Sequence, residues 1–362
     1  MTARTKVALS MLSLVPGGMG GTETYARALT RKLDPARIDA RCFVPGGAAG
    51  FSEGVPETVV PEVTAGPSTR ERLSVVGQSL VHRRAILRRM AAADVVHLPF
   101  TAEVPPLGRR IAKITTIHDV QHLDLPELFS AGERAYRRFS YERPARSADA
   151  VITISNFAQR SIVEHLGIAP EKVHVIPLGV DTAGFVPNLG ERENFLLYPA
   201  RPWAHKNHRR LIEAVEVLRR EDPELRLVLT GGELEKLGEL PDWVDARGLV
   251  PLEELRDLYR RARMLVFPSR YEGFGLPLLE AMASGCPVAA SNAGSIPEVC
   301  GDAAVFFDPE SVEGIVAAVR TASERTAWLQ QAGLARVREF SWDTCVRGHE
   351  DVYTAVAEGR RR

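Results

Sequence analysis

Strand-like and helix-like segments alternate along nearly the whole chain of 362 residues, and this alternation restricts the possible folds more than any other feature. Short apolar runs at 6–14, 150–154 and 264–267 have the composition of buried strands, and a helical segment follows each of them. Parallel strands need a crossover connection, usually a helix, so repeated strand–helix units build parallel sheets covered on both faces. The sequence therefore predicts an α/β protein with doubly wound parallel sheets.

The length of the chain exceeds what a single hydrophobic core usually organises, which favours two domains. Residues 182–193 contain Gly, Pro and Asn with little periodic pattern, as expected of a linker. The strand–helix alternation restarts after this segment. We therefore predict a first domain over residues 1–182 and a second that begins at residue 183.

The bulk composition is that of an ordinary soluble protein, with 45% hydrophobic and 25% charged residues. The formal net charge is zero, which does not favour nucleic-acid binding. The four cysteines have no paired spacing and no apolar run has the length of a membrane span, so we expect reduced cysteines and a cytoplasmic protein.

Arginine is frequent in one part of the first half. A solvated helix face is the simpler interpretation, and contact with an anionic membrane or with a substrate is the alternative. The residues concerned are Arg70, Arg72, Arg83, Arg84, Arg88 and Arg89.

Residues 264–299 form the most informative segment, read as strand, glycine-containing loop, helix and second strand. In open α/β sheets ligands bind at such a loop, where glycines allow close approach of the backbone and the helix N-terminus attracts an anion. Glu280 is placed to accept from a pair of ribose hydroxyls, and Glu272 to meet the hydroxyls of a second ring. The hypothesis is a loop that holds a sugar, a diphosphate and a nucleoside together. Two glutamates at this spacing also occur by chance on solvated helices.

The string Glu272-Gly-Phe-Gly-Leu-Pro-Leu-Leu-Glu280 resembles the motif of retaining glycosyltransferases with the GT-B fold, and its continuation through residues 281–288 and 294–298 resembles family 4 of that group. The resemblance implies two Rossmann-like domains that face a cleft. It also implies that a C-terminal helix, about 343–362, crosses back to the first domain, which leaves 183–342 as the nucleotide-sugar domain. The first domain would then bind the acceptor.

The resemblance also assigns roles in the second half of the chain. Arg201 and Lys206 match the family's basic pair, and together with Glu272 they are expected to act in catalysis. The stretch at 248–250 is expected to lie along the base. The predicted donor-binding residues of this half are Asn207, Gly248, Leu249, Val250, Gly273, Phe274, Gly275, Leu276 and Glu280.

In the first half the similar motifs are short. Gly20 and Gly21 would let the donor diphosphate lie against the backbone, although a tight turn without a ligand explains them as well. His118 resembles the active-site histidine near the reacting carbon, with a purely structural hydrogen-bonder as the alternative. Ser155 completes the predicted donor contacts, and His122 is a weaker candidate for contact with the acceptor.

Breaking the bond between a sugar and a diphosphate places negative charge on the leaving group, so catalysis needs positive charge there. The sequence has no Asp-x-Asp string for a metal, whereas Arg201 and Lys206 supply a guanidinium and an ammonium. We therefore expect no cofactor and no metal, with a nucleoside-diphosphate sugar as co-substrate. Glu272 and Glu280 do not suit a glycosidase pair, because Glu280 would face the nucleoside.

The implied activity is retaining, metal-independent transfer of a hexose or deoxyhexose to a hydroxyl of a glycan, a glycolipid or a natural product. Mannose from GDP, rhamnose from dTDP and sugars from UDP all remain open as donors. The region 117–128 resembles bacterial surface-polysaccharide mannosyl- and rhamnosyltransferases, which favours a lipid-linked acceptor. The alternatives are a sugar-nucleotide epimerase of the same fold and a catalytically idle nucleotide-sugar-binding partner of another transferase.

Overall fold

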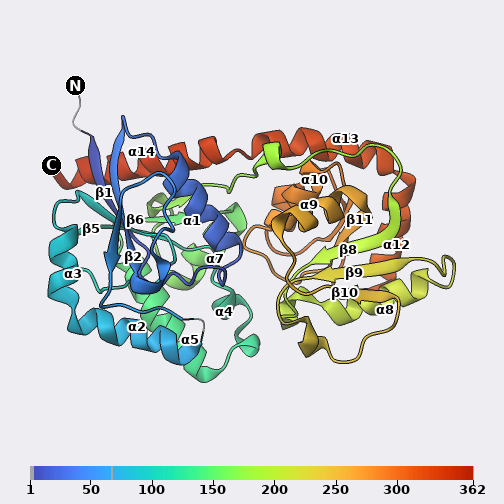
Figure 1. The fold of residues 1–362 in the computed structure, drawn as a ribbon, viewed down its shortest axis with the longest axis horizontal. Coiled ribbons are helices and arrows are strands. Elements are labelled where there is room, and N and C mark those ends of the chain that lie inside the picture. The colour runs from blue at the N-terminus through green and yellow to red at the C-terminus, as the bar shows by residue number, and fades with distance from the viewer. Residues whose placement is uncertain (1–3, 67, 109, 362) are drawn as a thin grey trace. The chain divides into compact units, whose positions relative to one another are not determined.

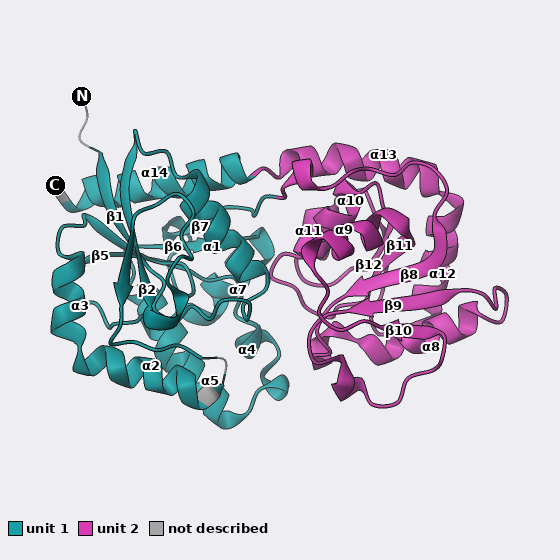
Figure 2. Cartoon of the chain, in the orientation of Figure 1, with its two compact units in different colours: residues 1–179, 342–362 teal, residues 180–341 magenta. Residues whose placement is uncertain are grey.

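The computed structural model describes residues 4–66, 68–108 and 110–361. The remaining residues, 1–3, 67, 109 and 362, belong to the predicted first domain and the predicted terminal helix. The chain divides into two compact units (Figures 1 and 2). Unit 1 comprises Met1–Gly179 with Trp342–Arg362, and unit 2 comprises Val180–Ser341. Each unit is a parallel sheet with helices around it, which confirms the predicted fold class.

The sheet of unit 1 has its strands in the order β3-β2-β1-β4-β5-β6-β7, and every neighbouring pair is parallel. The order reverses between β1 and β4, and in such sheets a crevice for ligands opens beyond the carboxyl ends of the strands at that point. The strands are β1 Thr5–Ser10, β2 Ile38–Pro45, β3 Glu57–Val60, β4 Val95–Leu98, β5 Ala112–Thr116, β6 Ala150–Thr153 and β7 Val173–Val175.

The last helix of the chain belongs to unit 1, as the sequence predicts. This helix, α14 (Trp342–Arg361), packs against α1 (Gly21–Lys32) and the central strands, and the Arg37–Glu350 ion pair of 2.7 Å ties it to the loop after α1 (Figure 2). The other helices of unit 1 are α2 Thr69–Val81, α3 Arg83–Met90, α4 Gln121–Asp124, α5 Ala131–Arg137, α6 Arg143–Arg146 and α7 Asn156–Leu166.

The structure adds detail to the sequence pattern at three segments of unit 1. The stretch at 46–67 lacks clear periodicity and is predicted to be mostly loop, which its described residues confirm apart from a 3₁₀ turn and β3. This edge strand is too short for its alternation to stand out in the sequence. The single helix expected at 70–92 is two helices, which meet at His82. The helix predicted at 132–146 is present from Ala131 onward, and it contains a π-helical turn over Arg138–Glu142.

Unit 2 has the strand order β10-β9-β8-β11-β12-β13, again parallel throughout. Its central strands are buried on both faces, as expected of near-continuous apolar runs. The strands are β8 Glu193–Pro199, β9 Arg226–Thr230, β10 Val244–Ala246, β11 Ala262–Phe267, β12 Val288–Ser291 and β13 Val305–Phe307. The helices are α8 His208–Leu218, α9 Leu252–Arg261, α10 Leu276–Ala283, α11 Ile296–Cys300, α12 Val312–Glu324 and α13 Thr326–Arg336.

Two further sequence expectations concern cysteines and membrane segments. All four cysteines are free and buried, as the spacing predicts. Within residues 4–66, 68–108 and 110–361, none of the helices combines the length and the apolar character needed to cross a bilayer.

Candidate active site

The loop between β11 and α10 carries the predicted glutamate motif, and its shape depends on glycine. Gly275 precedes α10 with φ of +100°, a backbone conformation that side chains rarely adopt. A Cβ at this position would lie 2.8 Å from Leu278 Cδ1. The helix begins at Leu276, and Pro277 lies in its first turn, where proline is tolerated. Leu276 is therefore part of the helix N-terminus that faces the loop.

The backbone around Glu272 is fixed from the turn that follows β12. The Ser295 backbone N–H and hydroxyl both donate to the Glu272 carbonyl, at 3.2 and 2.9 Å, and the hydroxyl also lies 3.0 Å from the Phe274 carbonyl. Gly294 lies so close that a Cβ there would be 2.9 Å from the Glu272 nitrogen and oxygen. Only glycine fits this contact, so residues 294 and 295 hold the glutamate loop in place.

The Glu272 side chain forms an ion pair with Lys206. The Lys206 Nζ lies 2.6 Å from Glu272 Oε1, and the two side chains are only 15% and 11% exposed. Lys206 ends a short 3₁₀ turn, Ala204–Lys206, in the loop after β8, and its carbonyl accepts a hydrogen bond of 2.8 Å from the Tyr198 hydroxyl. The structure thus brings two of the four predicted catalytic residues into direct contact at the carboxyl edge of the sheet.

Arg201, the other predicted cation, is in the same loop but forms no ion pair with the described residues. Its guanidinium lies 5.8 Å from the centre of the Trp203 ring. A Cβ added to Gly232 would be 3.6 Å from both Arg201 Nε and Leu249 Cγ, so these three residues are neighbours beyond the ends of β8, β9 and β10. The hydrogen bond from Lys236 and, as a smaller cause, the charge of Arg201 lower the pKa of Glu233, so this carboxylate is near Arg201 but forms its ion pair with Lys236. The half-buried Arg201 guanidinium therefore keeps its hydrogen-bond donors available to an anionic ligand.

The predicted base-contacting stretch follows β10 directly. Gly248 has φ of +67°, and its carbonyl accepts a hydrogen bond of 2.8 Å from the Gly231 N–H. Leu249 is 73% exposed, which is unusual for a leucine beside a buried sheet, and Val250 is half-buried. The stretch therefore offers exposed apolar surface next to Arg201.

Glu280 lies on α10 and is held by a residue that the sequence does not single out. The Tyr259 hydroxyl, on α9, donates to Glu280 Oε2 at 2.9 Å. Burial raises the pKa of Glu280, while the hydrogen bond from Tyr259 and the charge of Arg256 act in the opposite direction. Its second oxygen accepts no hydrogen bond from the described residues, so one side of the carboxylate remains available.

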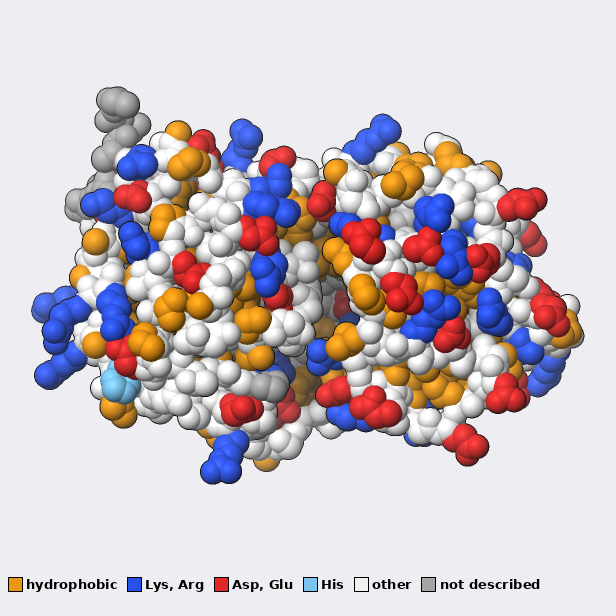
Figure 3. Space-filling view, viewed as in Figure 1, with side chains coloured by type: hydrophobic (Ala, Val, Ile, Leu, Met, Phe, Trp, Pro, Cys, Tyr) orange, Lys and Arg blue, Asp and Glu red, His pale blue; other side chains and the backbone are white. Residues whose placement is uncertain are grey.

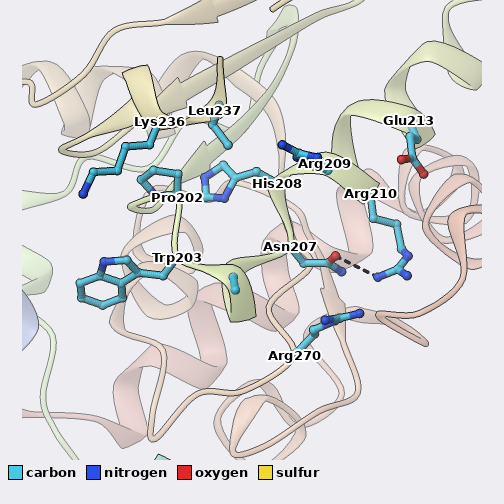
Figure 4. Close-up of a pocket in the computed structure, with 11 residues that line it drawn as sticks. Pro202, Trp203, Asn207, His208, Arg209, Arg210, Glu213, Lys236, Leu237 and Arg270 are labelled. Carbon is cyan, nitrogen blue, oxygen red and sulfur yellow. Dashed lines mark hydrogen bonds between the residues drawn. The ribbon is translucent and has the colours of Figure 1, made fainter. Parts of the chain in front are cut away.

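Asn207 has its amide occupied by the protein. It adopts the left-handed conformation with φ of +62°, and its Nδ2 donates to the carbonyls of Pro309 and Pro268 at 2.7 and 3.1 Å. Its Oδ1 accepts from Arg210 at 2.9 Å, at the edge of a cavity of about 450 Å³ (Figure 4). Asn207 thus shapes the loop that presents Lys206, and its contact with a donor stays a prediction.

In unit 1 the predicted residues all follow the carboxyl ends of parallel strands, which share one edge of the sheet. Gly20 has φ of +55° and precedes α1, of which Gly21 is the first residue. Ser155 follows β6 and caps α7, because its hydroxyl accepts from the Ala158 N–H at 3.1 Å.

His118 follows β5 and is neutral. Its Nε2 lies 3.2 Å from the Pro99 carbonyl, to which it donates, so the proton is on this nitrogen and Nδ1 keeps its lone pair. The ring meets Tyr25 edge to face at 5.3 Å. Burial lowers the pKa of His118 to about 4. A neutral imidazole at this edge offers a hydrogen-bond acceptor rather than a positive charge.

A buried polar network lies behind His118, and no sequence pattern predicts it. The Tyr25 hydroxyl is 2.8 Å from His349 Nε2 and 3.0 Å from Thr116 Oγ1. His97 Nε2 lies 2.8 Å from the same threonine, and its Nδ1 lies 2.7 Å from the Tyr353 hydroxyl. The network connects residues of α1, β4, β5 and α14. These residues are too far apart in the sequence for a spacing pattern to predict their contact.

The known proteins similar to this chain agree with this architecture. The model of the family "Glycosyltransferase Family 4" matches residues 19–183, and the model "Glycosyl transferases group 1" matches residues 181–332. The two models together cover both units and meet at the boundary between them.

The similar curated proteins include O-antigen chain mannosyltransferases of two bacteria. The O-antigen chain mannosyltransferase RfbU of Salmonella typhimurium is 30% identical over 86% of this chain and 89% of its own length. The O-antigen chain mannosyltransferase B of Escherichia coli is 32% identical over 64% of this chain and 67% of its own length.

Among solved structures, HepE from Anabaena in complex with UDP-glucose superposes with a TM-score of 0.72. It is 16% identical and covers 97% of this chain and all of its own. The protein is a two-domain GT-B glycosyltransferase. It belongs to the group 1 and family 4 glycosyltransferases.

Proposed function

We propose that the protein is a retaining, metal-independent glycosyltransferase. In this proposal it moves a hexose or deoxyhexose from a nucleoside-diphosphate sugar to a hydroxyl of a glycan, glycolipid or natural-product acceptor. The observation that carries the proposal is the Lys206–Glu272 ion pair in the same loop as Arg201, which forms no ion pair with the described residues. This arrangement provides two cations at the carboxyl edge of the unit 2 sheet, and Glu272 neutralises only one of them.

Two cations fit the charge that develops on a departing diphosphate. As the bond to the anomeric carbon breaks, the electron pair goes to the phosphate oxygen and the sugar becomes oxocarbenium-like. Arg201 and Lys206 stabilise that oxygen by charge-assisted hydrogen bonds, the work that a metal does in other transferases. The acceptor hydroxyl attacks from the face that the diphosphate leaves, and a phosphate oxygen takes its proton.

Two carboxylates of unit 2 divide the recognition of the donor between them. Glu280 is held by Tyr259 with one oxygen available, which suits the hydroxyls of a ribose. Glu272 sits in the loop of Gly273, Phe274 and Gly275, whose backbone approaches a ligand without obstruction by side chains. It is thus suited to the hydroxyls of the transferred sugar.

In unit 1 the neutral His118 offers a lone pair at the edge where Gly20 and Gly21 begin α1. In the proposal His118 accepts a hydrogen bond from a hydroxyl of the sugar being transferred. A neutral ring also avoids adding positive charge next to an oxocarbenium-like sugar, which a protonated histidine would destabilise.

The names of similar proteins decide which donors to test first. RfbU and the Escherichia coli relative are called mannosyltransferases, so GDP-mannose is the first donor. UDP-glucose is the second, because HepE was solved with it. dTDP-rhamnose completes the set.

The test is a transfer assay with these donors in the presence of EDTA, followed by NMR of the product. The proposal expects turnover with one nucleotide base, unaffected by EDTA, and a product with the anomeric configuration of the donor. Inverted configuration would exclude the retaining mechanism, and loss of turnover in EDTA would exclude metal independence. Release of an epimerised nucleotide sugar would favour an epimerase, and nucleotide binding without turnover would favour an idle binding partner.

Peripheral contact of unit 1 with an anionic membrane is a further part of the proposal. Basic side chains gather over the place of α3, with hydrophobic atoms among them (Figure 3). Leu80 and Val81, at the end of α2, are 50% and 80% exposed, and Arg84 and Arg88 are exposed without ion-pair partners among the described residues. Exposed apolar and basic side chains together are typical of interfacial binding.

Co-sedimentation with vesicles tests this contact. The protein should bind vesicles that contain anionic lipid and not neutral ones, and Arg84→Gln with Arg88→Gln should weaken that binding. Equal sedimentation of the double variant and the unaltered protein would contradict the contact.

A further inference from the structure

Unit 1 contains a cavity of about 380 Å³ to which nothing above assigns a role. The segment that forms it runs from α4 through α5 to the π-helical turn, and begins shortly after His118. Its lining residues are His122, Leu123, Ala131, Arg134, Ala135, Arg138 and Glu142.

The buried part of the cavity lining is polar and incompletely hydrogen-bonded. His122 is only 1% exposed, and neither of its ring nitrogens has a hydrogen-bond partner among the described residues. Its Nε2 lies 3.4 Å from Oε1 of Glu142, which is itself 6% exposed. Burial lowers the pKa of His122 to about 4, so the neutral ring has one donor and one acceptor to offer. Buried polar groups without partners are rare, so the His122 ring needs a hydrogen-bond partner from outside the chain, which a ligand in the cavity would supply.

The outer part of the lining is cationic. Arg134 and Arg138 lie one helical turn apart, both are exposed, and neither forms an ion pair with the described residues. By contrast, Arg137 on the same helix pairs with Glu133 at 3.2 Å and stacks on Phe129 at 4.6 Å. Two guanidinium groups without acidic partners match the charge and the oxygen geometry of a phosphoryl group.

The backbone between the two parts is a π-helical turn, Arg138–Glu142. Such turns are rare and occur frequently at functional sites. Here the turn begins at an exposed arginine and ends at a buried carboxylate, so one segment supplies both kinds of group to the cavity.

From this arrangement we infer that the cavity binds a phosphorylated sugar carried by the acceptor. Arg134 and Arg138 bind the phosphoryl oxygens, and His122 and Glu142 bind the sugar hydroxyls. Leu123 and two alanines of α5 provide an apolar wall for the C–H face of the ring. The inference rests on the proposed function, because it names the class of acceptor. A free sugar phosphate and the first sugar of a diphosphate-linked lipid both present this chemistry.

Calorimetric titration of the full chain tests the inference. The ligands are mannose 1-phosphate, mannose, inorganic phosphate and a detergent-dispersed polyprenyl diphosphate sugar. We expect a phosphorylated sugar to bind more tightly than mannose or phosphate. Preference for the soluble compound identifies a free sugar phosphate as the source, and preference for the dispersed one identifies a lipid.

The arginine variant changes only exposed side chains, so it keeps the test independent of folding. Arg134→Gln with Arg138→Gln should weaken binding of the phosphorylated sugar by about tenfold or more. Glu142→Gln should reduce the preference for phosphorylated sugar over inorganic phosphate. The matched control is Arg160→Gln with Arg347→Gln, two exposed arginines of unit 1 that form no ion pair with described residues, and it should bind like the unaltered chain.

The inference is overturned if inorganic phosphate binds as tightly as every phosphorylated sugar, if none of the ligands binds, or if the arginine variant behaves like its control. Titration of nucleoside diphosphates into the same samples separates the two proposals. Nucleotide binding without sugar-phosphate binding refutes only the cavity assignment, whereas absence of nucleotide binding refutes the proposed function.

Discussion

Replacing Lys206 by methionine removes one charge from the ion pair with Glu272 while keeping the length of the side chain. The pair is 2.6 Å long, and its members are 15% and 11% exposed, so solvent screens it only partly. Opening a fully buried pair costs about 3–5 kcal/mol and an exposed pair about 0–1, so we expect a loss of roughly 2–3 kcal/mol. For a unit of this size that corresponds to a Tm lower by about 4–12 °C.

The same variant should lose turnover for a separate reason. Removing one preorganised group that stabilises transition-state charge typically costs about 10²–10³ in rate. The double variant Lys206→Met with Glu272→Gln contains no uncompensated charge, so it should regain most of the stability. It should not regain turnover, because both groups are proposed to meet the donor.

Thermal unfolding and the transfer rate are measured on the same samples. The control is Arg320→Met, which opens an exposed ion pair with Glu221 on unit 2 and should change neither quantity appreciably. A double variant with both stability and turnover restored would show that the pair only supports the loop. Turnover of Lys206→Met near that of the unaltered protein would also refute the reasoning.

Three further predictions concern the surroundings of the site. Tyr259→Phe removes the hydrogen bond to Glu280, which is worth about 0.5–1.5 kcal/mol. Steady-state kinetics should therefore show a donor KM that is several-fold higher, with kcat little changed. An unchanged KM would contradict the role of Tyr259. Gly294 has φ of +63°, and Gly294→Ala would place a Cβ 2.9 Å from the Glu272 backbone. The variant should therefore have a lower Tm and a lower turnover. Full activity would show that the position of the glutamate loop is not critical. Buried neutral histidines such as His118, with its pKa lowered to about 4, bind protons more readily in the unfolded chain. The free energy of unfolding should therefore decrease as the pH is lowered from about 6.5 to 4, by up to about 1.4 kcal/mol per pH unit for each histidine. Urea unfolding at several pH values measures this decrease. A free energy of unfolding that stays constant over this range would contradict the prediction.

Sequence reasoning is most successful for the architecture. The alternation of strands and helices predicts two parallel α/β sheets, and the structure confirms both. The pattern is informative here because fully buried strands are apolar throughout and the connecting helices are amphipathic. It fails where elements are short or irregular, as for β3 and for the π-helical turn at Arg138–Glu142, because a few residues establish no period.

For the site, the sequence identifies the residues but not the groups that hold them. Glu272 and Lys206 are predicted separately, and the structure brings them into contact. Tyr259 and Ser295 are missed as supporting residues, because a single hydroxyl on a helix or turn has no distinctive spacing. The orientation of a tyrosine toward a carboxylate 21 positions away depends on the packing of α9 against α10, which only the fold provides.

Hydrogen–deuterium exchange with and without the donor nucleotide tests the central claim most directly, because it locates the nucleotide on the chain. If the loop between β11 and α10 holds the diphosphate, GDP or UDP should slow exchange at residues 270–280 and in the Arg201–Lys206 loop, in the presence of EDTA. Protection at 248–250 should accompany it. Protection confined to other segments, with 270–280 unchanged by a nucleotide that binds, would contradict the account.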